Sequence, residues 1–369
     1  MQWPVPDIPV KHPVSRPVNK KWGGMLFLMV ITGGALLVFV GRATSYGEVI
    51  LYGALPAFLI WLCFYGITWH RYEQSVNNAL LWNKESERIK LYWQNWCMQQ
   101  WGIVSNVVLT PEKEGVSALL GDYADIPAYP CKPRPLHVTL IGLYNRLKYI
   151  DIHSERQCSG YRHFLFSIQI LLPDMRMQHS VSKAVYEQWD LYPEYINSVD
   201  DVQSEAESKG LILLLCIQDW FTDNNKKHSE FISAQIITSV SFASEHKLPI
   251  IAGVGRVLSS DSLSEGLDIL CEYSRLTDIR LRHVWLTGTD GDDRVNIIQY
   301  AADLPWELPA KLPCHLLDHT FGPSGPLSFP VSVALMVDAA VNTGEIQLLI
   351  SCQKGKGYSF CLVAQELFL

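Results

Sequence analysis

Two uncharged apolar stretches near the N-terminus dominate the hydrophobic pattern of the chain. Gly24 to Gly41 and Val49 to Trp69 contain no Asp, Glu, Lys or Arg. About 20 apolar residues of helix cross the ~30 Å hydrocarbon core of a bilayer. The pattern therefore predicts two membrane spans, residues 24–41 and 49–69. A secretory signal peptide does not fit, because a proline-rich segment precedes the first stretch and a second stretch follows at once.

The alternative for both stretches is a helical hairpin buried in a protein core. Aromatic residues cluster at the ends of the two stretches, as they do at membrane–water interfaces, and this favours the spans. They are Trp22, Tyr46, Tyr52 and Trp69.

The pattern divides the whole chain into four parts. A proline-rich tail is followed by the membrane hairpin, an amphipathic stalk helix and a large α/β domain. Their expected bounds are residues 1–20, 21–70, 71–101 and 102–369, with 102–245 and 246–369 as two candidate halves of the last part.

Strand-like and helix-like stretches alternate after the stalk. Strands are expected at 103–109, 136–142, 210–218, 249–254 and 280–286, and helices at 161–172, 181–199, 229–246, 262–276 and 293–302. A helix at 327–341 and a hairpin of 346–351 with 358–364 close the chain. This alternation predicts an α/β fold with a mixed or parallel sheet. A similarity between 135–144 and 281–290 suggests two related halves.

Charge is distributed unevenly between the two ends of the chain. Residues 1–71 contain six Lys or Arg and two Asp or Glu, whereas the remainder contains 24 and 35. The cations flank both apolar stretches, so the positive-inside rule places both termini in the cytoplasm. The acidic remainder lacks the basic surface that phosphate backbones require, so nucleic acid is excluded as a partner.

The nine cysteines are scattered and form no CxxC pair. This is typical of reduced, buried thiols and not of a disulfide framework. Cys314, His315 and His319 lie close together, but no second cluster completes a zinc site. Cys158 and Cys216 are candidate nucleophiles, with His163 or His319 as the base. Cys216, however, lies within an expected buried strand, where its thiol would be unreactive.

Two further motifs are incomplete. Thr289 to Asp293 resembles a calcium loop, but Ala301 stands where the bidentate glutamate would be. Asp292 or Asp293 is expected to cap a helix beginning near Arg294 instead. Gly253-Val-Gly255 lacks the third glycine of a dinucleotide loop, with Leu258 at that position. The sequence thus predicts no catalytic, cofactor-binding or metal-binding residues.

The segment from His315 onward resembles the C-terminal end of thiolase-like condensing enzymes. In those enzymes a His-Thr-x-Gly-x-x-Gly run supplies the catalytic histidine, and His319, Thr320, Gly322 and Gly325 match it. The chain departs from the family at 351–358, where its Asn and Phe are absent, and no Cys-Ser-Ser run occurs upstream. The resemblance implies a shared fold whose active site is lost.

The order of hairpin, Trp-rich stalk, DYADIPAYP loop and LDHTFGPSGPLSFP terminus resembles a second family. This family comprises membrane-anchored, cytoplasmic-facing adaptors of type VI secretion lipase effectors. The resemblance implies a bacterial inner-membrane protein that is not an enzyme, binds a lipase effector and helps to load it onto the secretion spike. A thiolase-like acyltransferase and an effector immunity protein are the alternatives.

Overall fold

The computed structural model describes residues 3–6, 8–41, 45–121, 123–130, 132–138, 140–199, 210–220, 226–277, 279–353, 355 and 357–367. It contains two compact units. One is Val5–Tyr92, and the other combines Met1–Pro4 with Trp93–Leu369.

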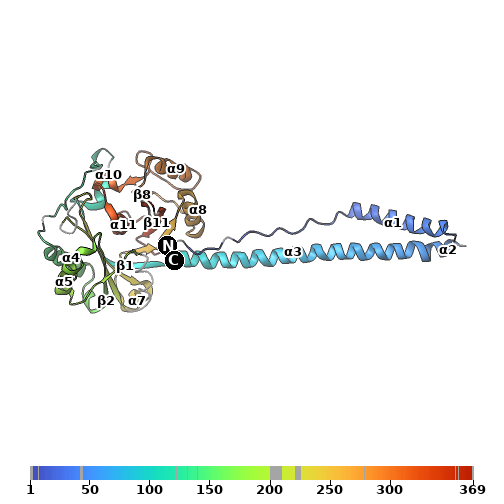
Figure 1. Cartoon of the computed structure of the whole chain (residues 1–369), viewed down its shortest axis with the longest axis horizontal. Helices are drawn as coiled ribbons and strands as arrows, with labels where there is room; N and C mark the ends of the chain where they lie inside the picture. Colours follow the sequence, from blue (N-terminus) through green and yellow to red (C-terminus); the bar gives the residue numbers. More distant parts are fainter. Residues whose placement is uncertain are drawn as a thin grey trace. The chain divides into compact units, whose positions relative to one another are not determined.

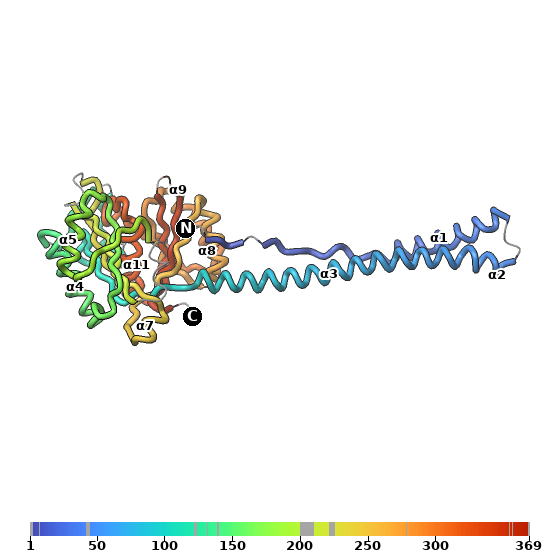
Figure 2. The backbone as a smooth tube through the Cα atoms, turned by 60° about the horizontal axis from the view of Figure 1, so that its bottom comes forward, coloured from blue at the N-terminus to red at the C-terminus, as the bar shows by residue number. Residues whose placement is uncertain are grey.

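The unit Val5–Tyr92 is a helical hairpin preceded by an extended segment. Its elements are α1 (Asn19–Phe39), α2 (Tyr46–Val49), the π-helical turn η1 (Ile50–Ala54) and α3 (Leu55–Cys97), which runs on into the second unit. Figures 1 and 2 show α1 beside the first part of α3. Where α1 contacts η1, a Cβ on Gly33 would lie 2.7 Å from the carbonyl oxygen of Gly53, so only glycine permits this approach.

Three helical stretches of the described chain are long and apolar enough to cross a membrane: Asn19–Phe39, Tyr46–Cys97 and Gly325–Thr343. The first two expose almost all of their apolar windows, of which 0% and 6% is buried. The third has 72% of its window buried. An apolar helix whose surface is covered by protein belongs to the core, so only the two N-terminal stretches remain candidate spans.

The second unit is built on one large mixed sheet with helices around it. Its helices are η2 (Gly115–Leu119), η3 (Tyr123–Asp125), α4 (Leu143–Gln157), η4 (Tyr161–His163), η5 (Met175–Met177), α5 (Gln178–Trp189), α7 (Val240–His246), α8 (Leu263–Tyr273), α9 (Gly291–Ala302), α10 (Leu317–Phe321), η6 (Gly325–Leu327) and α11 (Ser328–Thr343). Its strands are β1 (Gln100–Leu109), β2 (Leu165–Leu171), β3 (Glu194–Tyr195), β4 (Leu211–Gln218), β5 (Phe231–Ser239), β6 (Ala252–Gly255), β7 (Leu258–Ser260), β8 (His283–Thr287), β9 (His315–Leu316), β10 (Gln347–Gln353) and β11 (Gly357–Ala364).

The sheet consists of two halves with the same topology. The strand order is β3-β2-β4-β5-β1-β6-β11-β10-β8-β9, and β1 pairs with β6 where the halves meet. In each half three parallel strands lie outermost and an antiparallel pair lies towards the junction. The α/β fold class with two related halves is therefore confirmed. Figure 1 shows α4 and α5 beside the first half and α8 and α9 beside the second.

Helix α11 is the centre of the core because it packs against both halves. It contacts β1 and β5 of the first half and β6, β10 and β11 of the second. Its residues are apolar on almost every side, which is typical of a helix surrounded by protein. Gly344 ends it in the left-handed conformation, with φ of +70°.

Three of the expected elements are wrong. Residues 136–142 form no strand among their described positions, residues 165–171 form β2, and residues 231–239 form β5. The last two were expected to be helical. Strand β5 pairs with β1 on one side and β4 on the other, so it is buried on both faces. A short apolar run buried in this way has no periodicity that separates strand from helix.

Candidate functional site

A cavity of about 810 Å³ opens at the carboxyl ends of the parallel strands β8, β9 and β10. Thr287 and Gly288 come from the end of β8, Asp318 and His319 from α10 directly after β9, and Cys352 from the end of β10. The turn Pro323–Ser328, which leads into α11, forms the remaining wall together with His228 and Pro130. Ligand sites of open α/β sheets lie at this edge.

The carboxylate of Asp318 organises the floor of the cavity. It accepts hydrogen bonds from the Ser324 hydroxyl, from the Thr287 hydroxyl at 3.1 Å and from the Gly288 N–H at 2.5 Å. The hydroxyls of Thr287 and Ser324 also lie 3.2 Å apart. Ser324 is buried, with 8% of its surface exposed. These residues come from separate segments and form one connected polar cluster, which we call the Asp318 cluster.

Residues of the first half hold the turn that carries Ser324. Gln218, at the end of β4, donates to the carbonyl oxygen of Ser324 at 2.6 Å and accepts from the Leu327 N–H at 3.4 Å. His228 packs against Gly325 so closely that a Cβ there would lie 2.6 Å from its Cγ. Gly325 also has φ of +74°, which favours glycine. Both halves therefore contribute to the position of Ser324.

The cavity adjoins the N-terminal end of α11. Ser328, the first residue of this helix, lines the cavity, and no side chain caps the helix there. The Ser328 N–H donates to the carbonyl oxygen of Gly325, and Pro330 has no N–H, so the helix favours an anion here through the positive end of its dipole. His319 adds an exposed imidazole. Burial raises the pKa of the Cys352 thiol, with Asp293 and Asp290 adding to the effect, so this thiol is a poor nucleophile.

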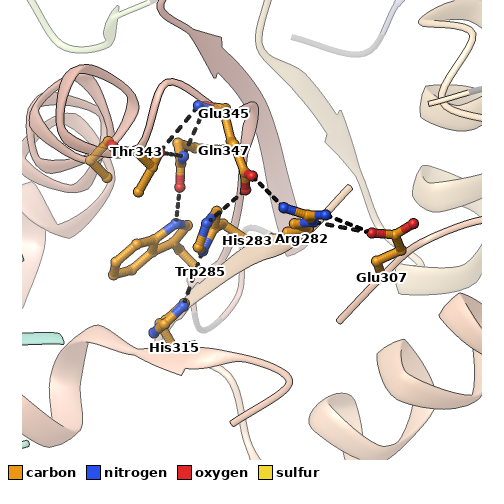
Figure 3. Close-up of polar contacts among 9 residues, drawn as sticks. Arg282, His283, Trp285, Glu307, His315, Thr343, Glu345 and Gln347 are labelled. Carbon is orange, nitrogen blue, oxygen red and sulfur yellow. Dashed lines mark hydrogen bonds and ion pairs between the residues drawn. The ribbon is translucent and has the colours of Figure 1, made fainter. Parts of the chain in front are cut away.

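A second polar cluster lies at the opposite, amino end of the same strands (Figure 3). The imidazoles of His283 and His315 lie 3.5 Å apart at their nearest nitrogens, and His283 forms a 3.1 Å ion-pair contact with Glu345. His315 stacks on Trp285 with ring centroids 4.2 Å apart, and Trp285 donates to Gln347 at 2.8 Å. Burial, with a contribution from His283, lowers the pKa of His315 to about 4.

Asp338, on α11, affects the pH dependence of stability in the opposite direction. Burial raises the pKa of Asp338 to about 6, although a 2.6 Å hydrogen bond from Asn106 opposes the shift. His315 is buried in its neutral form, so its contribution to stability is present above pH 6.5 and is lost as the pH falls towards 4. Asp338 favours folding when protonated, so its contribution is lost as the pH rises from about 4 to 6.

We expect these two effects to oppose each other in the native chain between pH 4 and 6. Asp338→Asn should remove the Asp338 effect and leave that of His315. The free energy of unfolding should then rise from pH 4 to 6.5 by up to about 3 kcal/mol. His315→Gln should instead leave stability falling over pH 4 to 6. Denaturant unfolding of the full chain in detergent, followed by Trp fluorescence at several pH values, measures both. His179→Gln, at an exposed position, is the control. Parallel pH profiles for both variants would contradict the assignment.

Cys314, His315 and His319 are close in sequence but lie in different places in the structure. Cys314 is fully buried, His315 stacks on Trp285 at the amino end of the strands, and His319 lines the cavity at the carboxyl end. Within the described ranges no group of three or more His, Cys, Asp or Glu side chains could hold a metal ion.

The acidic motif forms a helix cap, but the capping residue is Asp290, two or three residues earlier than the expected Asp292 or Asp293. Asp290 caps α9 and accepts from the Asp293 N–H at 2.9 Å, while the Asp293 carboxylate accepts from the Asp290 N–H at 3.3 Å. Asp293 also accepts from the hydroxyl of Tyr358 at 2.7 Å. Gly253 and Gly255 lie within strand β6 and not in a loop.

Neither of the two candidate cysteine nucleophiles lies at the cavity. Cys158 is buried directly after α4 and Cys216 within β4. Burial raises the pKa of both thiols, that of Cys216 to about 12, so neither provides a thiolate at neutral pH. His163 lies in η4 and does not line the cavity. Among the residues singled out from the sequence, Thr289, His319 and Gly325 lie at the cavity.

Sequence analysis missed Thr287, Asp318, Ser324 and Gln218. Thr287 and Asp318 are separated by the whole of α9, and Gln218 belongs to the other half. One pattern could have indicated part of the site, because polar residues that directly follow buried strands gather at one edge of a parallel sheet. Thr287 ends the apolar run of β8 and Gln218 that of β4.

The fold is similar to that of ketosynthases. The KS7 ketosynthase domain of oxazolomycin OzmH from Streptomyces albus matches with a TM-score of 0.53 and 7% identity, over 73% of this chain and 76% of that one. The KS8 domain of the same protein matches with a TM-score of 0.50 and 8% identity, over 73% and 96%. OleA from Xanthomonas campestris matches at 0.49 and 9% identity, over 74% and 98%. No family model and no curated protein matches the chain.

The chain therefore has a thiolase-like fold. The expected resemblance to thiolase-like enzymes is confirmed at the level of the fold. The expectation that the chain is not an enzyme is wrong on this finding, because the fold that it shares is an enzyme fold. The expected relation to the type VI secretion adaptor family has no support from these comparisons.

Proposed function

We propose that the chain is a membrane-associated acyltransferase of thiolase-like fold, which accepts an acyl thioester in the cavity at the carboxyl ends of β8, β9 and β10. The observation that carries the proposal is the Asp318 cluster. It holds the buried Ser324 hydroxyl against a carboxylate beside the uncapped end of α11. A hydroxyl bonded to a base and close to the positive end of a helix dipole suits acyl transfer.

The reaction would proceed in two balanced steps. The Ser324 Oγ bonds to the thioester carbonyl carbon, and its proton passes to Asp318. The oxyanion that forms is favoured by the positive end of the α11 dipole at Ser328. The C–S bond then breaks, and the departing sulfur takes the proton from Asp318. In the second step an acceptor hydroxyl loses its proton to the exposed His319 and attacks the acyl-serine ester. The C–O bond to Ser324 then breaks, and the proton held by His319 passes to the departing Ser324 Oγ.

The test is acylation of the purified full chain by a palmitoyl-pantetheine thioester, followed by intact-mass and peptide mass spectrometry. We expect one added acyl group on Ser324. Ser324→Ala should remove it, and Asp318→Asn should slow it by about 100-fold or more, which is typical of the loss of a general base. Thr289→Val is the matched control, because Thr289 lines the same cavity and has no hydrogen bond to Asp318 among the contacts of the described residues.

Two results would overturn the proposal. One is acylation that persists at full rate in Ser324→Ala and maps to a cysteine such as Cys63, the exposed thiol in the described part of the chain. The other is tight binding of the thioester with no covalent product after prolonged incubation, which would reduce the site to acyl binding without transfer.

We also propose that α1 and the first part of α3 span the bacterial inner membrane with both chain termini in the cytoplasm. Their apolar length and the cations at their outer ends support this topology. An active alkaline phosphatase fused to the C-terminus would contradict it, because that enzyme matures only in the periplasm. A lipase effector or spike protein as partner remains a prediction from the sequence. Co-purification with the full chain from its native host would test it.

A further inference from the structure

An elongated groove of about 920 Å³ lies within the unit Val5–Tyr92, between the extended N-terminal segment and α3. The segment is tied to the helix at several points. Trp82 donates to the carbonyl oxygen of Pro9 at 3.0 Å, Asn83 exchanges two hydrogen bonds with the backbone of Lys11, and the Val14 N–H donates to Ser75 at 2.8 Å. Figures 1 and 2 both show the segment running alongside α3. The groove is therefore a built feature of this unit.

Cationic side chains line this groove on both of its walls. Lys11, Arg16 and Lys21 belong to the N-terminal wall and Arg71 to α3. No Asp or Glu lines the groove. In the parts of the chain that the structure describes, no carboxylate lies within ion-pair distance of any of these four cations. Four positive charges around one groove without an internal counter-charge favour an anionic occupant.

One end of the groove is apolar. Trp22, Phe64 and Ile67 line it there, next to a row of ring contacts that joins Trp22, Tyr65 and Trp69. Such a row of aromatic rings is typical of the membrane–water interface. The groove thus runs from the interfacial level of the hairpin into a cationic region. A ligand that combines acyl chains with a negatively charged phosphate matches both ends.

We propose that this groove binds the phosphate of an anionic phospholipid, with the acyl chains beside Phe64 and Ile67. The proposal rests on the membrane insertion proposed above. Arg16, Lys21 and Arg71 surround the phosphate at the interfacial end, where Arg16 also lies over the Trp69 ring at 5.5 Å. Basic pockets at the cytoplasmic ends of membrane helices bind anionic head groups in this way.

The experiment places the full chain in nanodiscs that contain phosphatidylcholine with or without phosphatidylglycerol. The lipid retained after detergent extraction is then measured by native mass spectrometry. We expect retained phosphatidylglycerol and little phosphatidylcholine. Arg16→Gln combined with Arg71→Gln should lower phosphatidylglycerol retention by roughly 30-fold, since each cation near the surface contributes about fivefold. Lys21→Gln with Arg71→Gln is a second variant that leaves the Arg16–Trp69 contact intact.

The matched control is Lys84→Gln with Arg88→Gln, which removes the same number of charges from positions of α3 outside the groove. An equal loss of retained phosphatidylglycerol in the groove and control variants would show only long-range attraction of the lipid to cations, and it would overturn the proposed site. Displacement of the lipid by millimolar inorganic phosphate would show that the groove binds free phosphate, and it would overturn the proposal of a lipid ligand. Elution of the chain outside the nanodiscs would instead contradict membrane insertion, which separates that failure from failure of the groove.

Discussion

Arg146→Met is expected to lower the free energy of unfolding by about 3–5 kcal/mol. Arg146 lies on α4 and is buried together with two carboxylates. Its Nη1 lies 3.3 Å from Asp219 and 3.5 Å from Glu230. Asp219 and Glu230 are themselves buried at the ends of β4 and β5. Removal of the guanidinium would leave two like charges in a region of low dielectric, which is far more costly than the loss of a surface ion pair.

A combined variant separates this charge effect from a simple packing loss. Asp219→Asn added to Arg146→Met should recover part of the lost stability, because it removes one uncompensated charge. Arg88→Met is the exposed control, since the side chain of Arg88 is 78% exposed and pairs with Glu85 across one helical turn. We expect it to change stability by at most about 0.5 kcal/mol. Similar losses for Arg88→Met and Arg146→Met in denaturant unfolding would show that the buried cluster has no special role.

Gly288→Ala is the second change with a large expected effect, on both stability and the cavity. Gly288 has φ of +69°, and a Cβ there would meet the carbonyl oxygen of Cys352 closer than 3.0 Å, which real Cβ atoms essentially never show. The substitution would therefore force β8 and β10 apart at their carboxyl ends. We expect a loss of about 2–4 kcal/mol from backbone strain and the displaced contact.

The same substitution should also disturb the Asp318 cluster, because the Gly288 N–H donates to Asp318. Acylation of Ser324 should then fall even at temperatures where the variant is folded. Gly291→Ala is the matched control three residues away, where an added Cβ meets nothing within 4 Å at the start of α9. It should be neutral or slightly stabilising. Equal melting temperatures for the two variants would contradict the steric argument.

The two N-terminal stretches and the α/β class followed from sequence pattern because both depend on local periodicity and length. An uncharged run long enough to cross a bilayer needs no partner to be recognised. The closing hairpin, now β10 and β11, was also expected, because two alternating runs joined by a glycine-rich turn pair locally. Buried strands whose pairing partners are far away in the chain were harder to predict from the sequence. Strand β5, between β1 and β4, was expected to be a helix.

The candidate site depended almost entirely on tertiary structure. His319 could be singled out because its motif is contiguous, but Thr287, Asp318 and Ser324 form a cluster only after β8 and β9 pair in parallel. Gln218 reaches Ser324 from the other half of the sheet. Contacts between residues so distant in sequence leave no periodic trace, since each residue alone is an ordinary polar position.

Helix α11 shows what the sequence determines and what only the tertiary structure decides. The sequence by itself predicted an apolar helix at residues 327–341, and the structure has it at Ser328–Thr343. Its hydropathy alone would also admit a membrane span. Only the tertiary structure decided that it is a core helix, because both halves of the sheet cover it and take the place that lipid would otherwise have. The sequence determines how apolar a helix is, whereas the surrounding fold determines which apolar environment receives it.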